Sequence, residues 1–366
     1  MAFLLHHQLQ SLLDVLAGEG YQCVGPQVQD GAIVYAPLAS AAELPRGYRD
    51  QQGPGEYRLV RENPQRFFAW ANGPQALKPL VFAPRESAWQ ARRESGGALS
   101  FAPVAPQSRP TAVIGVRACD LAALALLDRH FLHESSPDRY YAARRDDLFL
   151  VAVNCTHPAA TCFCASTGDG PDATSGYDLV LSELDDGFII EAGSNAGQRA
   201  LAQLQLDTDS KAQRSTAAAA TANAAQQQSR CVPSRNMRNL LFANLESPHW
   251  EEVAQRCLAC GNCTSVCPTC FCHAHREEPA IDGVHSHHVR EWDSCFSQGH
   301  SYIHGLTVRS HTRERYRKWL VHKFGGWHDQ FGRSGCTGCG RCITWCPVGI
   351  DVTAELAVLN AGGQGK

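Results

Sequence analysis

The sequence lacks the features that define several common protein classes. No apolar run approaches the roughly 20 residues that a helix needs to span a bilayer. The net charge of −3 provides no excess of positive charge, which argues against general nucleic-acid binding. Residues 1–20 have no basic start and no cleavage site, so we do not expect a signal peptide. These absences favour a cytoplasmic protein without a membrane span.

Motifs for phosphate binding and for hydrolysis are also missing. Neither G-x-G-x-x-G nor G-x₄-G-K-[ST] occurs, and these are the loops that bind the phosphates of nucleotides. No Ser–His–Asp set and no pair of carboxylates can be argued from spacing. We therefore predict no catalytic residues, and the chain is expected to carry electrons without an active site of its own.

Cysteine, in contrast, is abundant, with 17 residues in a chain of 366. An odd count in a long chain without a secretory segment argues against a disulfide framework. Reduced thiols in this number indicate the cytosol. The cysteines are therefore expected to bind metal.

Two copies of one cysteine pattern lie far apart in the chain. The first runs from Cys257 to Pro268 and the second from Cys336 to Pro347, and each reads C-x₂-C-x₂-C-x₃-C-P. This pattern binds [4Fe–4S] clusters in bacterial-type ferredoxins, where the fourth cysteine usually binds the cluster of the other copy. We therefore predict two [4Fe–4S] clusters that share ligands between the copies.

Each predicted cluster takes three cysteines from one copy and the fourth from the other. The first cluster is predicted to be held by Cys257, Cys260, Cys263 and Cys346. The second is predicted to be held by Cys336, Cys339, Cys342 and Cys267. A pair of zinc sites is the alternative, but zinc needs only four ligands and has no use for a third evenly spaced cysteine or a trailing proline.

Composition divides the chain into three segments. Residues 1–197 alternate strand and helix patterns and are predicted to form an α/β domain. Residues 198–230 are rich in Ala and Gln and are predicted to be a solvated, partly helical connector. Residues 231–366 hold both cysteine patterns and are predicted to form an α-rich, ferredoxin-like domain with two [4Fe–4S] clusters.

Local patterns place the main elements. The predicted strands are Ala32–Leu38, Tyr57–Arg61, Leu80–Ala83, Thr111–Val116, Leu148–Val153, Asp178–Ser182 and Phe188–Glu191. The predicted helices are Met1–Gly20, Leu121–Phe131 and Arg309–Lys323.

A further group of cysteines falls at the ends of two predicted strands. Cys119 follows the strand 111–116 and Cys155 follows the strand 148–153, with a helix between them. A strand–helix–strand unit makes the two strands parallel neighbours, so their carboxyl ends share one edge of the sheet. We predict a third metal site there, an iron–sulfur cluster in preference to zinc. Its ligands would be Cys119, Cys155, Cys162 and Cys164. Buried, inert cysteines are the alternative.

The start of the helix beside Cys119 bears on the chemistry of that thiol. Asp120 is a favourable N-cap residue for the helix over 121–131. The positive end of the helix dipole should lower the pKa of the Cys119 thiol and favour an anionic cluster.

Several other residues have two readings. Cys270, Cys272 and Cys295 could contact a cluster, although packing beside it is the simpler interpretation. The histidines of 285–288 are predicted to lie in a solvated loop, because nothing fixes four ligands there. The basic residues of 309–323 are predicted to form a solvated face. The functional alternatives are that they raise a cluster potential or dock an acidic partner.

Taken together, the motifs resemble a known family, the beta subunit of cytosolic [NiFe] sulfhydrogenases and its relative, the A subunit of anaerobic sulfite reductase. The segments that carry the resemblance are Gly115–Leu121, Asn154–Cys155, Cys162–Cys164, Cys257–Cys272, Trp292–Cys295, Arg315–Arg317, His322–Phe324 and Cys336–Pro347. They cover most of the chain from residue 111 onward.

The resemblance implies a non-catalytic electron-transfer subunit of an oxidoreductase complex. Its partners would be a flavin- and NAD(P)-binding reductase subunit, a small iron–sulfur subunit and a large [NiFe] hydrogenase subunit. A catalytic subunit that reduces sulfite is the alternative acceptor. The resemblance also makes a third [4Fe–4S] cluster near Cys119 more credible. A redox-sensing iron–sulfur module is an alternative from a different functional class.

Overall fold

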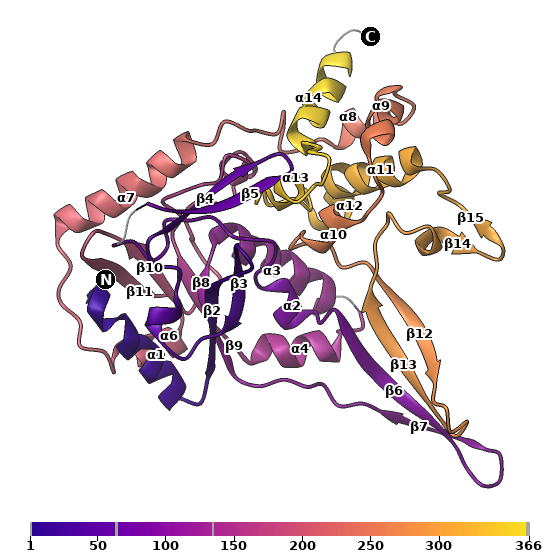
Figure 1. Cartoon of the computed structure of the whole chain (residues 1–366), viewed down its shortest axis with the longest axis horizontal. Coiled ribbons are helices and arrows are strands. Elements are labelled where there is room, and N and C mark those ends of the chain that lie inside the picture. The colour runs from indigo at the N-terminus through magenta and orange to yellow at the C-terminus, as the bar shows by residue number, and fades with distance from the viewer. Residues whose placement is uncertain (1, 63–64, 134, 364–366) are drawn as a thin grey trace.

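The structure is a computed structural model that describes residues 2–62, 65–133 and 135–363. Its largest element is a sheet with the strand order β1-β11-β10-β9-β8-β2-β3 (Figure 1). The central strands β2, β8, β9 and β10 run parallel, and the outer strands run antiparallel to their neighbours. The strands are β1 (Ala2–Leu5), β2 (Gln22–Gln29), β3 (Ala32–Pro37), β8 (Thr111–Val116), β9 (Leu148–Val153), β10 (Leu179–Glu183) and β11 (Gly187–Ala192).

Helices cover both faces of this sheet (Figure 1), which is why β8 and β9 at its centre are buried along nearly their whole length. Alternate residues of β9 belong to different cores. Phe149 and Val151 pack in one core with the leucines of α1 (Leu9–Gly18). Leu150 packs in the other core with residues of α3 (Ala118–Phe131), and α4 (Arg139–Asp146) follows α3 in the chain. The mixed α/β character predicted for this part of the chain is therefore confirmed.

Two of the predicted elements are wrong. The N-terminal segment is not one helix, because Ala2–Leu5 forms strand β1 and pairs antiparallel with β11 before α1 begins at Leu9; Met1 lies outside the described residues. The apolar run from Leu80 to Ala83 is not a strand, because residues Lys78–Val81 form the short helix α2. Pro79 lies in the first turn of this helix, where its missing N–H costs nothing.

A second sheet joins two distant parts of the sequence. Its strand order is β12-β13-β6-β7, and it extends away from the body of the molecule (Figure 1). The inner strands β13 and β6 pair antiparallel across almost two hundred residues. The strands are β6 (Arg85–Arg93), β7 (Leu99–Pro103), β12 (His273–Pro279) and β13 (His285–Trp292). The histidines of 285–288 thus begin a strand, and the predicted loop is wrong.

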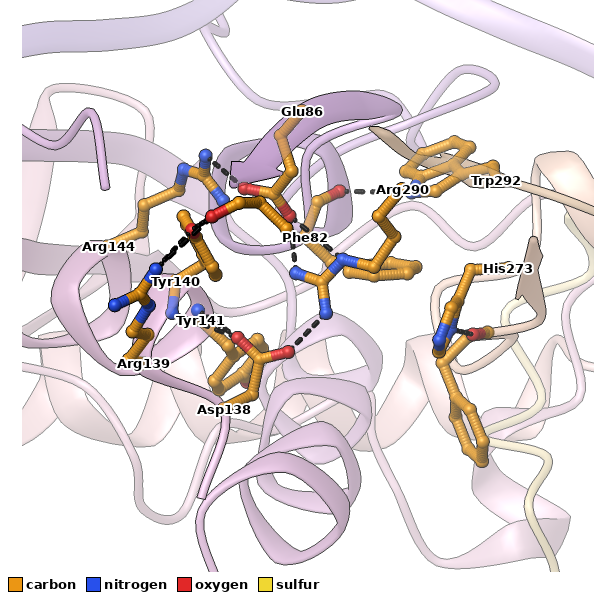
Figure 2. A network of polar contacts seen from close by, with 12 residues as sticks. Phe82, Glu86, Asp138, Arg139, Tyr140, Tyr141, Arg144, His273, Arg290 and Trp292 are labelled. Atoms are coloured by element: carbon orange, nitrogen blue, oxygen red, sulfur yellow. Dashed lines mark hydrogen bonds and ion pairs between the residues drawn. The ribbon is translucent and has the colours of Figure 1, made fainter. Parts of the chain in front are cut away.

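A buried polar network fixes this sheet to the α/β part of the chain (Figure 2). The Arg290 guanidinium donates to the carboxylates of Glu86 and Asp138, with 3.0 Å between Arg290 Nε and Glu86 Oε1. Arg144 Nη2 also donates to Glu86, at 2.7 Å. At the same end, Trp292 Nε1 donates to the carbonyl oxygen of Phe82 at 3.2 Å. The end of β13 nearest the cysteine-rich segment is therefore held in place.

The remaining elements are mostly short helices and hairpins. Residues 198–230 include α7 (Lys211–Gln226), and Ala217 of this helix packs in a small core with Phe3 and Ile189. The other helices are α5 (Cys164–Thr167), α6 (Asn195–Leu201), α8 (Arg238–Ala243), α9 (His249–Arg256), α10 (Asn262–Ser265), α11 (Thr312–Val321), α12 (Trp327–Phe331), α13 (Arg341–Thr344) and α14 (Val352–Gly363). The hairpins are β4 (Tyr48–Gly53) with β5 (Glu56–Arg61), and β14 (Tyr302–Ile303) with β15 (Leu306–Thr307). Short 3₁₀ turns are His6–Gln8, Ala41–Glu43 and Gly299–Ser301, and His322–Gly326 is a π-helical turn. Across the described ranges, no helix has both the length and the apolar character to cross a membrane.

Candidate metal centres

Both cysteine patterns fold into a loop that runs into a one-turn helix. Gly261 precedes α10 with φ of 79°, and Gly340 precedes α13 with φ of 75°. Glycine is favoured at such left-handed positions because it has no Cβ. At Gly340 a Cβ would also lie 2.4 Å from the backbone oxygen of Thr161, so the second loop requires glycine for close packing as well. The matching glycines therefore give the two loops the same local shape.

The first pocket brings the last cysteine of the second pattern to the first three of the first pattern. It is apolar and lined by Phe296, Tyr316 and Trp319. Five cysteines line it, namely Cys342 of the second pattern and the four predicted ligands Cys257, Cys260, Cys263 and Cys346. Two backbone N–H groups donate to sulfur here, Ala259 to Cys257 at 3.4 Å and Ile350 to Cys346 at 3.3 Å. N–H donors of this kind stabilise cluster sulfurs.

Buried donors without partners show that this pocket fits a group with acceptor atoms. Tyr316 Oη and Trp319 Nε1 are buried, and neither has a hydrogen-bond partner within the described residues. An unmet buried donor is costly, and native proteins satisfy nearly all of them. The sulfur atoms of an iron–sulfur cluster would supply acceptors at this place. The donor set therefore fits a cluster better than an empty apolar pocket.

The second group of thiols combines the first three cysteines of the second pattern with the last cysteine of the first pattern. Its members are Cys336, Cys339, Cys342 and Cys267. Burial raises the pKa of the Cys336 and Cys342 thiols, and the nearby Cys267 adds to the effect on both. The backbone N–H of Gly338 donates to Cys336 Sγ at 3.4 Å. The thiols of this group are only partly exposed and act on one another, so as thiolates they would repel each other unless a cation or cluster binds them.

A buried lysine lies against this second group. Lys323 is 4% exposed, and its Nζ lies 3.5 Å from Cys267 Sγ and 2.7 Å from Thr269 Oγ1. It comes from the π-helical turn, a rare geometry that is often found at functional sites. A second buried lysine, Lys78, donates to the carbonyl of Ser265 at 2.9 Å and lies over the Trp292 ring. The prediction that Lys323 belongs to a solvated face is therefore wrong, and Lys78 was not identified from the sequence.

The third group gathers the cysteines at the carboxyl edge of the large sheet. Its members are Cys119, Cys155, Cys162 and Cys164. Cys164 and Cys155 both act electrostatically on Cys162, and Cys164 also acts on Cys119. Gln228 Nε2 donates to Cys164 Sγ at 3.3 Å. The third group also adjoins the second, since Cys162 Sγ lies 3.8 Å from the carbonyl oxygen of Cys339.

A buried cation with two unpartnered N–H groups lies beside the third group and fits an anionic cluster. Arg117 is 3% exposed, and its Nη2 donates to the carbonyl oxygens of Phe68 and Trp70. Its Nε and Nη1 are buried and have no partner among the described residues. Arg117 also acts electrostatically on the Cys155 thiol. A buried charge is costly unless it is paired, so negative charge at this site would stabilise the fold.

Two expectations about the start of α3 are wrong. The N-cap residue is Arg117, and Asp120 lies inside the first turn with its carboxylate turned to other partners. The pKa of the Cys119 thiol is not lowered, because burial and the nearby Asp120 carboxylate raise it well above its ordinary value. Burial at the edge of the sheet thus outweighs the helix dipole.

Single-ion sites are the alternative to clusters. In the part of the chain that the structure describes, no group of three or more His, Cys, Asp or Glu side chains has the geometry to hold one metal ion. Such a geometry is what a zinc site requires.

Comparisons with known proteins agree with the cysteine patterns. Residues 256–350 match the family model described as 4Fe–4S dicluster domain. The chain is 30% identical over 255 residues to sulfhydrogenase 2 subunit beta of Pyrococcus furiosus. That alignment covers 68% of this chain and 74% of the relative. No solved structure matches the chain.

Proposed function

Because this chain belongs to the family of sulfhydrogenase beta subunits, we propose that it relays electrons between a flavin- and NAD(P)-binding subunit and a [NiFe] catalytic subunit. The observation that supports the proposal is the position of the last cysteine of each pattern, since Cys346 lines the first pocket and Cys267 acts electrostatically on Cys336 of the second group. Bound clusters would accept and release single electrons. The chain's own residues bind these clusters, exclude water from them and set their potentials.

The cluster ligands follow from the three groups of thiols. We propose that each of the first two groups, as defined above, holds one [4Fe–4S] cluster, and that the third group holds another. The unpartnered donors of Tyr316 and Trp319 support the first assignment, and the unpaired charge of Arg117 supports the third.

The order of the groups suggests a route for the electrons. The third group adjoins the second through Cys162 and Cys339, and the second adjoins the first through Cys267, which acts electrostatically on Cys263. The first group reaches the surface, where Cys260 is exposed and Leu258 is 63% exposed. We infer that one redox partner docks over Cys260, since electron transfer requires a cofactor close to the contact surface.

The surroundings of the groups differ in charge. The first group faces aromatic and aliphatic side chains, whereas the second faces the ammonium of Lys323. A nearby positive charge stabilises the reduced, more negative state and so raises the reduction potential. We therefore propose that the second cluster has the higher potential of the two.

The proposal extends to the domain boundaries of the chain and to its cellular compartment. We propose an α/β domain over 1–197, a connector over 198–230 and a dicluster domain over 231–366, with the sheet β12-β13-β6-β7 bridging the first and last. We propose the cytoplasm as the location, because 17 reduced thiols require a reducing compartment.

Co-purification under anaerobic conditions tests this function. A tagged full-length chain, expressed in its own host, should co-purify with a flavoprotein and with NAD(P)-linked hydrogen uptake. The Cys263→Ala variant should still assemble but should lose that electron transfer, whereas the control Cys231→Ala should keep it, because Cys231 is exposed and outside all three groups. If the purified complex instead reduces sulfite, its catalytic subunit is a sulfite reductase and not a hydrogenase. A chain that purifies without any redox partner would contradict the proposal.

A further inference from the structure

Two cysteines outside the three groups lie side by side at the end of the second sheet. Cys272 directly precedes β12, and Cys295 follows the end of β13. The strands pair His273 with Trp292, and the next backbone contact joins Asp293 N to the carbonyl oxygen of Cys272 at 2.9 Å. The Cys272 and Cys295 side chains come within hydrogen-bonding reach of each other, and each shifts the pKa of the other thiol. The fold therefore brings two thiols together across residues that are distant in sequence.

A histidine and a carboxylate complete the arrangement. His300 Nδ1 lies 2.6 Å from Asp293 Oδ2, and the same imidazole hydrogen-bonds to the Cys272 sulfur. A nucleophile in contact with a base that a third group orients is the usual arrangement for an activated thiol. Hydrogen bonds from Cys295 and His300 lower the pKa of Cys272 to about 4, and the bond to Cys272 raises the pKa of His300 to about 9. Within the pair, Cys272 is therefore the thiol that loses its proton more readily.

The two thiols also differ in exposure. Cys272 is partly exposed, whereas Cys295 is 9% exposed. In thiol–disulfide exchange, an accessible thiolate attacks first and a second thiol then displaces it. Cys272 has the accessibility and charge of the attacking sulfur, and Cys295 has the position of the resolving sulfur.

The loop that carries Cys295 packs directly on the first cluster loop. Thr264 Oγ1 and Ser294 Oγ are 2.8 Å apart, and a Cβ at Gly261 would lie 3.2 Å from Ser294 Oγ. Cys263 of the first group acts electrostatically on the Cys295 thiol. The thiol pair is therefore adjacent to a proposed electron carrier.

We propose that Cys272 and Cys295 form a redox-active dithiol that reduces low-molecular-weight disulfides at the edge of the dicluster domain. The Cys272 thiolate attacks one sulfur of R–S–S–R, and R–S⁻ leaves and takes the proton of His300. Cys295 then attacks the Cys272 sulfur of the mixed disulfide, and its proton leaves with the second R–S⁻ as R–SH. The products are the Cys272–Cys295 disulfide and two R–SH. Reduction of the Cys272–Cys295 disulfide back to the dithiol consumes two electrons and two protons. The inference rests on the proposed function for the supply of these electrons, which would come from the cluster relay.

Mass mapping of the full-length, anaerobically prepared protein tests the exchange. The protein is treated with cystamine as the probe disulfide, quenched in acid, alkylated and digested with trypsin. Cleavage after Arg290 places the two cysteines on different peptides, so the disulfide appears as a linked pair. We expect this linked peptide and the release of two cysteamine molecules per chain. Absence of the link in protein that shows its cluster signals would overturn the dithiol and leave the relay intact.

Variants separate a redox role from a ligand role. Cys272→Ser and Cys295→Ser should each abolish the link while iron content stays that of the unaltered protein, and Cys231→Ser should change neither. In a dithionite titration of cystamine-treated protein, Cys272→Ser should take up two fewer electrons per chain. Cys295→Ser should instead keep a mixed disulfide at Cys272, which releases one cysteamine per chain on reduction. A loss of iron in Cys272→Ser or Cys295→Ser would make these residues cluster ligands and would refute the proposal.

The role of His300 has a separate readout. His300→Gln should slow the alkylation of Cys272 by iodoacetamide at pH 6 by roughly tenfold or more, because the thiolate fraction falls when the hydrogen-bonded imidazole is removed. His304→Gln is a suitable control, since His304 lies outside the pair. An unchanged alkylation rate in His300→Gln would refute the activating role.

Discussion

Asp120 and Arg341 form a buried, two-armed ion pair that joins the third group of thiols to the second. Arg341 Nη1 lies 2.6 Å from Asp120 Oδ1, and Nη2 lies 2.9 Å from Oδ2. The two side chains are 0% and 2% exposed. Asp120 follows Cys119 directly, and Arg341 lies between two cysteines of the second pattern. This contact therefore sets the position of one group of ligands relative to the other.

Loss of this ion pair should destabilise the protein strongly. In Asp120→Asn the guanidinium stays buried without a counter-charge, and such a change costs about 3–5 kcal/mol. Urea unfolding under anaerobic conditions, followed by tryptophan fluorescence, measures the difference. The control is Glu62→Gln, which removes an exposed ion pair with Arg49 and should cost about 0–1 kcal/mol. Equal effects of the two variants would contradict the account of the buried pair.

Lys323 should hold the potential of the second cluster above that of the first. A unit charge about 7 Å from a cluster contributes about 2 kcal/mol at an effective dielectric constant near 20, or roughly 100 mV for a one-electron carrier. Lys323→Met should therefore lower the midpoint potential of the second cluster by about this amount and leave that of the first cluster unchanged. Redox titration with EPR detection measures both potentials. Lys318→Met alters an exposed lysine on the preceding helix and should shift neither. A shift of both clusters, or of none, would refute the assignment.

Exchange of the fourth ligand between the patterns predicts which variants lose the same cluster. Cys346→Ala and Cys257→Ala lie in different patterns but line one pocket. Both should lose the same EPR signal and about four irons. Cys336→Ala should lose the other signal. If Cys346→Ala instead behaves like Cys336→Ala, each pattern binds its own cluster and the proposed ligand sets are wrong.

A buried carboxyl in the large sheet should make stability depend on pH. Glu183 is 1% exposed, and it accepts hydrogen bonds from the backbone N–H groups of Phe67 and Phe68. Burial raises its pKa from 4.5 to about 7. The folded state thus binds the Glu183 proton more tightly than the unfolded state does. This contribution to stability is complete below pH 4.5 and is lost as the pH rises through 7.

The variant Glu183→Gln isolates this effect. Between pH 5.5 and 8 the unaltered protein should lose about 2 kcal/mol of unfolding free energy relative to the variant. His6, which lies 3.7 Å from Glu183, has a pKa lowered to about 4 by burial and acts in the opposite sense, but it is present in both proteins. Urea midpoints at the two pH values give the comparison, with the exposed Asp185→Asn as control. A constant difference between the two proteins across this range would contradict the raised pKa.

Buried strands and cysteine spacing account for what could be predicted from the sequence. Strands β8 and β9 were predicted with their observed bounds, because parallel strands buried on both faces read as unbroken apolar runs. The parallel pairing of β8 with β9, which puts Cys119 and Cys155 just beyond the same ends of two neighbouring strands, followed from the strand–helix–strand rule. Both inferences rest on local patterns that tertiary contacts reinforce.

The second sheet could not be predicted in the same way. Strand β6 is mostly charged or polar and partly exposed, so it shows no alternation of apolar residues. Its partner β13 lies almost two hundred residues away. The run at Leu80 was short enough to fit a strand or a helix, and only its packing decides for helix α2.

The buried cations and the thiol pair were also beyond the reach of sequence patterns. Lys78 comes from the α/β part of the chain and contacts the segment after Cys263 only in the folded protein. Lys323 is one of many basic residues in its segment, and nothing in their spacing marks it as buried. Cys272 and Cys295 meet only because β12 and β13 pair.

Iron analysis with EPR of the dithionite-reduced, anaerobically prepared protein tests the central claim most directly. The account predicts about eight to twelve irons per chain, since each [4Fe–4S] cluster holds four. It also predicts signals from magnetically interacting cubanes, because the first and second groups are adjacent. Chiefly zinc in the metal analysis, or no cubane signal after reduction, would contradict the claim that this chain is an electron relay.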